Sequence, residues 1–215
     1  MRSSKEAARR LYAVAESQAG LFTAKQAQTA GFGPSSHTYH VREGNWAREF
    51  RGIYRLTAFP AALRPELSRW HLWSMDRAGR AQGVYSHSTA LGLYSFPELK
   101  PPVLHMTVPA SFRRSSATPE GLALHYADLP ESDISAGDGY RLTTPLRTIL
   151  DLAALDLTGS SLEGPGAAGS GTLGRKALSE ALFQMVKRGL ISRSQILGAK
   201  IPEASRLQLE ALLAG

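Results

Sequence analysis

Residues 23–56 read TAKQAQTAGFGPSSHTYHVREGNWAREFRGIYRL, and this stretch decides the fold that we predict. Thr23 can cap a short helix over residues 24–30, and Gly31 can end that helix in a left-handed conformation. A further helix is predicted over residues 34–43, because its first residue is a proline, which suits the first turn of a helix. Two short helices separated by a tight turn are therefore expected.

After these helices, the spacing of apolar residues changes from a helical to a strand-like pattern. Residues 46–50 and 53–57 are rich in β-forming side chains, and between them lies Arg51–Gly52, where glycine tolerates the positive φ of a tight hairpin turn. Upstream, apolar residues recur at three- and four-residue steps over residues 4–19, which predicts a helix. The order helix, helix-turn-helix, hairpin is typical of a winged helix-turn-helix, so the chain is expected to begin with this domain.

Beyond residue 60 the pattern predicts a mixed α/β domain. Strands are expected near residues 103–108 and 122–126. Helices are expected near residues 65–78, 86–95, 144–155 and 175–189. The sequence thus predicts an α+β protein with a winged helix-turn-helix over residues 1–60 and a mixed α/β domain over residues 61–215.

Positive charge is concentrated in the first 60 residues. The 215-residue chain has 25 Lys+Arg and 18 Asp+Glu, a formal net charge of +7. Nine of the basic and four of the acidic residues lie in residues 1–60, which therefore have a net charge of +5. A basic domain of this kind favours a polyanionic partner, and double-stranded DNA is the partner that a helix-turn-helix fits.

The second helix of the turn is expected to enter the major groove with its N-terminal half toward the base edges, while Val41 faces the core. The candidate base readers are Ser35, Ser36, His37, Tyr39 and His40. Cations of the helix-turn-helix and the wing are expected to neutralise phosphates. These further DNA-binding candidates are Lys25, Arg42, Arg48, Arg51 and Arg55.

Other interpretations of the same residues remain open. Small three-helix domains with a hairpin also serve as protein-interaction modules, in which Arg48 and Arg51 would only solvate a turn. His37 and His40 lie three residues apart, as a metal-binding pair can, but the further ligands that zinc needs are not evident. We therefore expect no metal here, and no cofactor anywhere in the chain.

Four motifs carry a resemblance to a known family. Residues 39–56 resemble the winged-helix segment of the AbiEi antitoxins of bacterial type IV toxin-antitoxin systems, in which the wing ends in an RG(V/I)YR strand. Residues 86–91, SHSTAL, resemble the family's SHxSAL motif, and residues 104–109, LHMTVP, its VHxTVP strand. Residues 143–153, TTPLRTILDLA, resemble its TTPxRTxLDLA helix.

This resemblance implies a function for each half of the chain. The N-terminal domain would bind DNA, the promoter region of its own operon, and repress transcription. The C-terminal domain would counter a toxin of the nucleotidyltransferase type without forming a stable complex with it. The Gly-rich residues 158–174 depart from the family pattern and are predicted to form a loop.

The downstream motifs also have local structural explanations. Thr144 can cap a helix, and Arg147 and Asp151 are spaced to pair on its surface. Ser86 can likewise cap the helix predicted over residues 86–95. A helix cap with a polar neighbour is a more frequent role for residues such as Ser86 and His87 than a catalytic pair.

No catalytic constellation is legible, and no enzyme activity is predicted. The chain has no cysteine, which excludes thiol chemistry, and it lacks the common nucleotide-binding and zinc-protease motifs. Glu98 and Lys100 fit a fragment of a metal-dependent nuclease, with Asp76 as the one acidic partner upstream.

No apolar segment approaches the ~20 residues that span a bilayer, and a cytoplasmic protein is expected. A regulator without a toxin partner and, less well supported, a nuclease are the alternatives.

Overall fold

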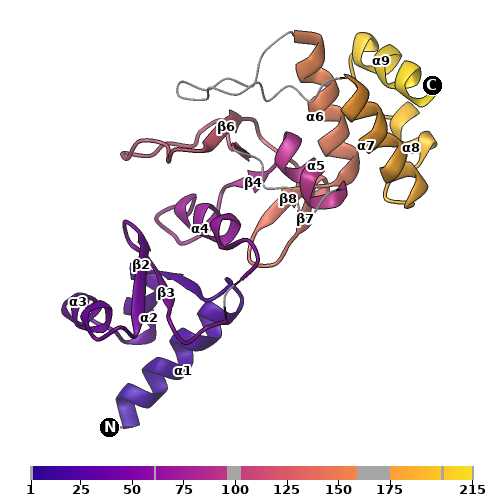
Figure 1. Ribbon diagram of the computed structural model, residues 1–215. Helices are drawn as coiled ribbons and strands as arrows, with labels where there is room; N and C mark the ends of the chain where they lie inside the picture. Colours follow the sequence, from indigo (N-terminus) through magenta and orange to yellow (C-terminus); the bar gives the residue numbers. More distant parts are fainter. Residues whose placement is uncertain (1, 61, 96–102, 159–174, 200, 215) are drawn as a thin grey trace. The chain divides into compact units, whose positions relative to one another are not determined.

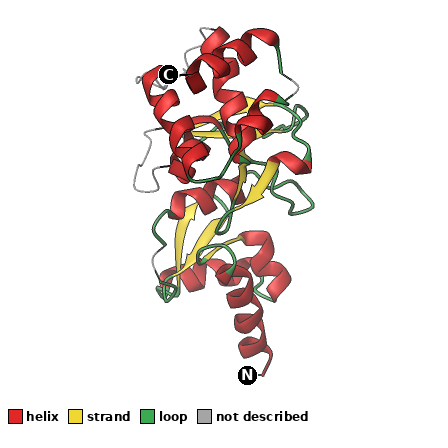
Figure 2. Ribbon diagram, turned by 90° about the vertical axis from the view of Figure 1, so that its right-hand side faces the viewer, coloured by secondary structure: helices red, strands yellow, loops and turns green. Residues whose placement is uncertain are grey.

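The computed structural model describes residues 2–60, 62–95, 103–158, 175–199 and 201–214 (Figure 1). Its contacts divide the chain into two compact units. The first is Met1–Gly83 with Ala136–Arg141, and the second is Val84–Ser135 with Leu142–Gly215. Each unit combines helices with strands, as the colours of Figure 2 show, so the α+β prediction is confirmed.

The first unit is a winged helix-turn-helix. Its elements are α1 (Arg2–Glu16), β1 (Leu21–Thr23), α2 (Ala24–Ala30), α3 (Pro34–Arg42), β2 (Trp46–Phe50), β3 (Ile53–Leu56) and α4 (Pro65–Trp73). The three strands form one antiparallel sheet in the order β1-β3-β2. The predicted helix-turn-helix and hairpin are therefore present in the predicted order.

The helix ends follow from residue type. The Thr23 hydroxyl accepts a hydrogen bond from the Gln26 amide at 3.2 Å, and the Gln26 side chain accepts one from the Thr23 amide at 2.8 Å. This reciprocal capping satisfies two amides that would otherwise lack partners at the start of α2. Gly31 ends α2 at a φ of 114°, and Gly52 takes a φ of 74° in the turn between β2 and β3. Side chains rarely tolerate such angles, so glycine is needed at both turns.

An aromatic core holds the two helices of the turn against the sheet. Phe22 of β1 meets Trp46 of β2 edge-on, with ring centroids 4.8 Å apart, and Leu11 of α1 is buried in the same cluster. The sequence pattern missed β1, because a three-residue strand is too short to show alternation. Its pairing with β3 places Phe22 opposite Tyr54 and so contributes to this core.

The first unit continues beyond residue 60. Helix α4 packs against β1 and β3, and Trp70 meets Phe50 edge-on at 5.1 Å. Residues 136–141 return to this unit from far along the sequence. Gly139, with a φ of 76°, leaves so little room that a side chain would lie 2.8 Å from Ser68 Oγ, and the Arg141 guanidinium donates to the Ala81 carbonyl at 3.3 Å. The compact unit therefore differs from the segment 1–60 that the sequence pattern delimits.

The second unit is a mixed sheet with a helical layer. Its elements are β4 (Val84–Tyr85), α5 (His87–Ser95), β5 (Leu104–Val108), β6 (Leu122–Tyr126), η1 (Glu131–Asp133), β7 (Ile134–Ala136), β8 (Arg141–Thr143), α6 (Pro145–Thr158), α7 (Arg175–Lys187), α8 (Arg193–Leu197) and α9 (Glu203–Ala214). The strand order is β6-β5-β4-β8-β7, with β4 antiparallel to β5 and parallel to β8.

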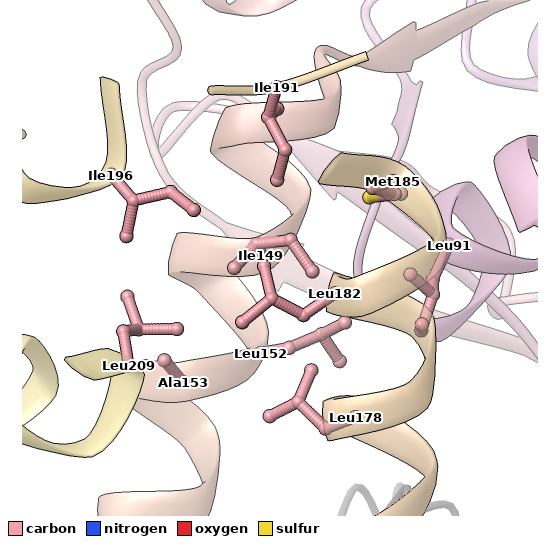
Figure 3. Packing of buried hydrophobic residues seen from close by; sticks show 11 residues of the cluster. Leu91, Ile149, Leu152, Ala153, Leu178, Leu182, Met185, Ile191, Ile196 and Leu209 are labelled. Carbon is pink, nitrogen blue, oxygen red and sulfur yellow. The ribbon is translucent and has the colours of Figure 1, made fainter. Parts of the chain in front are cut away.

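Helices α5, α6, α7, α8 and α9 share one apolar core. Ile149 of α6 and Leu182 of α7 are fully buried and point toward each other, and Leu209 of α9 joins them (Figure 3). The strands predicted near 103–108 and 122–126 and the four predicted helices are present, with ends shifted by up to five residues. The short elements β4, β7, β8 and α8, together with α9, were not predicted.

Some sequence-based expectations lie outside the described residues. Thr158 ends α6, and the rest of the predicted Gly-rich loop, residues 159–174, is not described. The same holds for Glu98 and Lys100. Within the described residues, no helix is both long and apolar enough to cross a bilayer.

Candidate nucleic-acid interface

One face of α3 presents polar side chains to solvent. Ser35 and Arg42 are exposed, and Tyr39 is 51% exposed. The Arg42 guanidinium lies 5.6 Å from the centroid of the Tyr39 ring, within cation–π range. The Arg42 Nε also donates to the Glu43 carboxylate at 3.1 Å, so this guanidinium is ion-paired and its terminal nitrogens remain as donors. The Tyr39 phenol and these nitrogens can donate hydrogen bonds to base edges or phosphates.

Ser36 is half-buried at the start of the same helix. Its hydroxyl donates to the Gly33 carbonyl at 2.7 Å, just before α3 begins. The oxygen still has lone pairs with which to accept a hydrogen bond, but its proton is already used. Ser36 therefore fits a contact with a donor better than a contact with a phosphate.

His37 lies in the core and not on the exposed face of α3. Its side chain is buried, with 6% exposed, and its Nε2 lies 3.2 Å from the Phe32 carbonyl oxygen. Its ring packs against Trp46 at 5.5 Å and against Tyr54 at 5.7 Å. The interpretation of His37 as a base reader is corrected, because its imidazole belongs to the aromatic core.

His40 lies at the rim of that core. Its ring stacks on Trp46 with centroids 4.6 Å apart and planes at 21°. Burial lowers the pKa of His40, and the nearby His37 lowers it further. The stacked His40 ring supports α3 on the sheet and leaves only part of the ring for DNA.

The wing, which is the β2–β3 hairpin, carries two kinds of arginine. Arg48 and Arg51 are exposed and have no ion-pair partner in the described part of the chain. Arg55 instead donates to Glu49 at 2.9 Å, and Arg69 of α4 donates to the other oxygen of Glu49 at 2.7 Å. The guanidinium of Arg55 is therefore half-buried and bound to Glu49, but Glu49 is shared with Arg69, so this group of three side chains keeps a net positive charge. Arg55 as a phosphate ligand stays a prediction.

Sequence reasoning missed the role of Glu49. The register of β2 and β3 shifts between Arg48 and Phe50, so Glu49 lies at an irregularity of the ladder. An extra residue of this kind redirects a side chain, and strict alternation cannot predict where it points. The one available signal is an acidic residue in an otherwise basic hairpin.

Lys25 lies in the first turn of α2 and is exposed. Its ammonium donates to the Arg77 carbonyl, which lies beyond α4. An ammonium has three donors, so two remain for other ligands. The structure thus brings Lys25 near a segment that the sequence analysis did not connect with it.

A comparison with family models finds a match for this domain. Residues 9–57 match the family described as "Transcriptional regulator, AbiEi antitoxin". The AbiEi resemblance is confirmed for the winged helix. The match covers α2, α3 and the wing, and so includes all ten candidate DNA-binding residues. No curated protein matches the chain.

The SHxSAL-like and VHxTVP-like motifs lie outside the AbiEi match and meet in the second unit. Ser86 is fully buried, its Oγ lies 2.8 Å from His87 Nδ1, and it accepts a hydrogen bond from Thr107 at 2.8 Å. His87 has a φ of 52°, which is unusual for a side chain with a Cβ. The Ser86 hydroxyl is enclosed between these two partners, which fits a structural role better than nucleophilic attack on a substrate.

Three imidazoles gather beside this pair. The His87 and His125 rings stack with centroids 3.8 Å apart, and His105 Nδ1 lies 3.0 Å from His125 Nε2. Burial lowers the pKa of all three, to about 4 for His105 and about 2 for His87, where the other two histidines and Arg147 contribute. Among the described residues no group of three potential ligands is placed to hold a metal ion. The lone pairs of stacked rings lie in nearly parallel planes and do not converge on one point.

The TTPxRTxLDLA-like motif builds a half-buried ion pair. The Arg147 amide donates to the Thr144 hydroxyl at 3.3 Å, which confirms the predicted cap of α6. The guanidinium of Arg147 donates to Asp151 at 2.7 Å and to Asp133 at 3.0 Å. Only 12% of the Asp151 side chain is exposed, so the expected surface location of this pair is wrong. Asp133 precedes β7, and Arg147 therefore ties α6 to the edge of the sheet.

Proposed function

We propose that the protein binds double-stranded DNA through the exposed face of α3 and the wing, and represses transcription of its own operon. The observation that carries this proposal is the coincidence of the AbiEi match with three exposed cations, Lys25, Arg48 and Arg51, that have no ion-pair partner among the described residues. A helix-turn-helix with such cations has both parts that recognition requires, which are base contacts from the helix and phosphate contacts around it.

In this proposal, some side chains contact bases and others contact phosphates, according to their chemistry. Ser35, Tyr39 and Arg42 extend from α3 toward base edges. Lys25, Arg48 and Arg51 neutralise phosphates and release counterions, which makes the affinity fall as the salt concentration rises. The aromatic core under α3 fixes the position of the helix, so that its backbone does not have to be ordered on binding.

A mobility-shift assay tests this part of the proposal. The purified chain is titrated onto the DNA upstream of its own gene, with a scrambled duplex of the same composition as control. We expect a shift of the upstream DNA at concentrations that leave the scrambled duplex free. Equal affinity for the two duplexes would contradict sequence-specific repression.

We further propose that the protein is the antitoxin of a type IV system and acts in the cytoplasm. In this proposal it counters a nucleotidyltransferase-type toxin without a stable complex, and no cofactor takes part. The AbiEi description of the matched family supports the antitoxin role. The resemblance of three motifs in the second unit supports placing that role there.

Co-expression with the neighbouring toxin tests the antitoxin role. The toxin is expressed from an unrelated promoter, so that repression of its synthesis cannot be mistaken for neutralisation. We expect the full chain to restore colony counts, and the variant Arg51→Ala to restore them equally well. Failure of the full chain would leave only the regulator.

A stand-alone regulator is the second candidate. It is favoured by the extent of the family match, which ends at residue 57 and includes none of the second unit. A gene for a nucleotidyltransferase beside this one would favour the antitoxin, and its absence would favour the regulator.

A further inference from the structure

A short turn follows α4 in the first unit and lies outside the family match. Residues 75–81 read MDRAGRA, and Met75 and Ala81 form an antiparallel bridge that closes the turn. The Asp76 amide donates to the Arg80 carbonyl at 2.9 Å, and the Asp76 carboxylate accepts from the amide and the Nε of Arg80 at 2.9 and 3.0 Å. The turn is therefore held in one conformation by its own hydrogen bonds.

Two contacts connect this turn with the wing through α2. The Lys25 ammonium donates to the Arg77 carbonyl in the middle of the turn. The amide of the preceding residue, Ala24, donates to the Gly52 carbonyl at 2.8 Å, and Gly52 is the second residue of the wing turn. The Met75–Ala81 turn, the start of α2 and the tip of the wing therefore form one continuous surface within the first unit.

This surface is basic. Lys25, Arg51, Arg77 and Arg80 are all exposed. Asp76 is the one carboxylate in the turn, and Arg80 satisfies both of its oxygens. Arg77 has no ion-pair partner among the residues that the structure describes, so its charge is uncompensated.

We propose that the Met75–Ala81 turn is a second phosphate-contacting element of the DNA interface, in which Arg77 binds the DNA backbone beside Lys25 and Arg51. This proposal rests on the proposed DNA-binding function and extends its surface beyond residues 9–57. The ligand is the phosphate backbone, because Arg77 lies on a turn outside the helix that enters the major groove, and an exposed guanidinium without an ion-pair partner binds phosphate oxygens well.

Within the turn, the Asp76 carboxylate pairs with Arg80. Because Asp76 pairs with Arg80, Arg77 has no carboxylate partner within the turn. A rigid turn lowers the entropy that Arg77 loses when it binds a phosphate.

Salt-dependent binding of the full-length chain tests this proposal. The affinity for the upstream DNA and for a random duplex is measured by anisotropy over a range of KCl concentrations. We expect Arg77→Ala to weaken binding to both duplexes alike and to lower the log–log salt slope by about one unit, as loss of one phosphate contact does. Arg77→Lys retains the charge and should restore most of the slope.

Two controls separate the possible outcomes. Arg206→Ala removes an exposed arginine from α9 of the second unit and should leave the slope unchanged. Arg51→Ala tests the wing itself. If Arg51→Ala lowers the salt slope but Arg77→Ala leaves it unchanged, as Arg206→Ala does, the turn does not contact DNA. The proposal for the turn is then wrong, while the proposed DNA binding is supported. If the unmodified chain binds neither duplex, the proposed function fails and the turn proposal fails with it. Thermal unfolding of each variant checks that the fold is intact.

Discussion

Tyr39 and His37 lie two residues apart on α3 and have opposite environments, one exposed and one buried. Tyr39→Ala is expected to reduce discrimination between the upstream DNA and a random duplex, because a good base contact contributes about 1–3 kcal/mol of specificity. The measurement is the ratio of the two dissociation constants at one salt concentration. An unchanged ratio would remove Tyr39 from the base readers.

His37→Ala acts on the fold instead. The substitution leaves a cavity beside Trp46 and Tyr54 and removes the contact with the Phe32 carbonyl, so we expect a loss of about 1–3 kcal/mol in the free energy of unfolding. Urea denaturation measures this loss. A variant with unchanged stability but reduced specificity would restore His37 as a reader.

The three histidines of the second unit predict acid sensitivity. Burial holds the pKa of His105 at about 4 and that of His87 at about 2, below the value of 6.5 in the unfolded chain. The unfolded state therefore binds more protons as the pH falls below 6.5, and stability is lost progressively between about pH 6.5 and pH 4. Urea midpoints measured across this range should fall, and His125→Gln should reduce the steepness of the fall. A flat profile would contradict the buried neutral cluster.

At the scale of elements, the arginines of the wing are expected to have two roles. Arg51 contacts DNA phosphates, whereas Arg55 stabilises the fold through Glu49. Arg51→Ala should lower the salt slope of DNA binding by about one unit. Arg55→Ala should lower the slope less than Arg51→Ala does, because its guanidinium is half-buried and bound to Glu49, and should cost about 1 kcal/mol of stability. Binding and unfolding measured on the same two variants decide the matter. Equal salt slopes for the two variants would show that Arg55 contacts the DNA backbone as fully as Arg51 does.

The helix-turn-helix was predictable because its signals are local. Capping by Thr23, the proline at Pro34 and the turn at Gly52 each depend on a few neighbouring residues. The elements that were missed depend on distant partners. Strands such as β4 have two residues, and only pairing with β5 and β8 gives them a structure.

The candidate site was predictable only where its residues depend on local sequence signals. Helical spacing selects the α3 segment, but the burial of His37 depends on Trp46 and Tyr54, which approach from the sheet. The pairing of Arg55 depends on an irregular residue of β2 and on a helix that begins at Pro65. A single sequence contains these residues without showing that they meet.

At the scale of the whole molecule, the first compact unit sets a limit on dissection. A fragment of residues 1–60 loses the Phe50–Trp70 contact and the Glu49–Arg69 ion pair. We expect it to unfold at a lower temperature than a fragment of residues 1–83, and to bind DNA more weakly. Thermal denaturation of both fragments checks this expectation. Equal melting temperatures would show that the wing needs no support from α4.

The return of Ala136–Arg141 to the first unit also has a consequence for synthesis. A domain at the start of a chain commonly folds while the remainder is still being translated. Here the segment that packs against Ser68 and bonds to Ala81 is made only after most of the second sheet has been translated. A nascent chain that ends before Arg141 lacks these contacts, so the first unit reaches its complete form only when the ribosome has passed that codon.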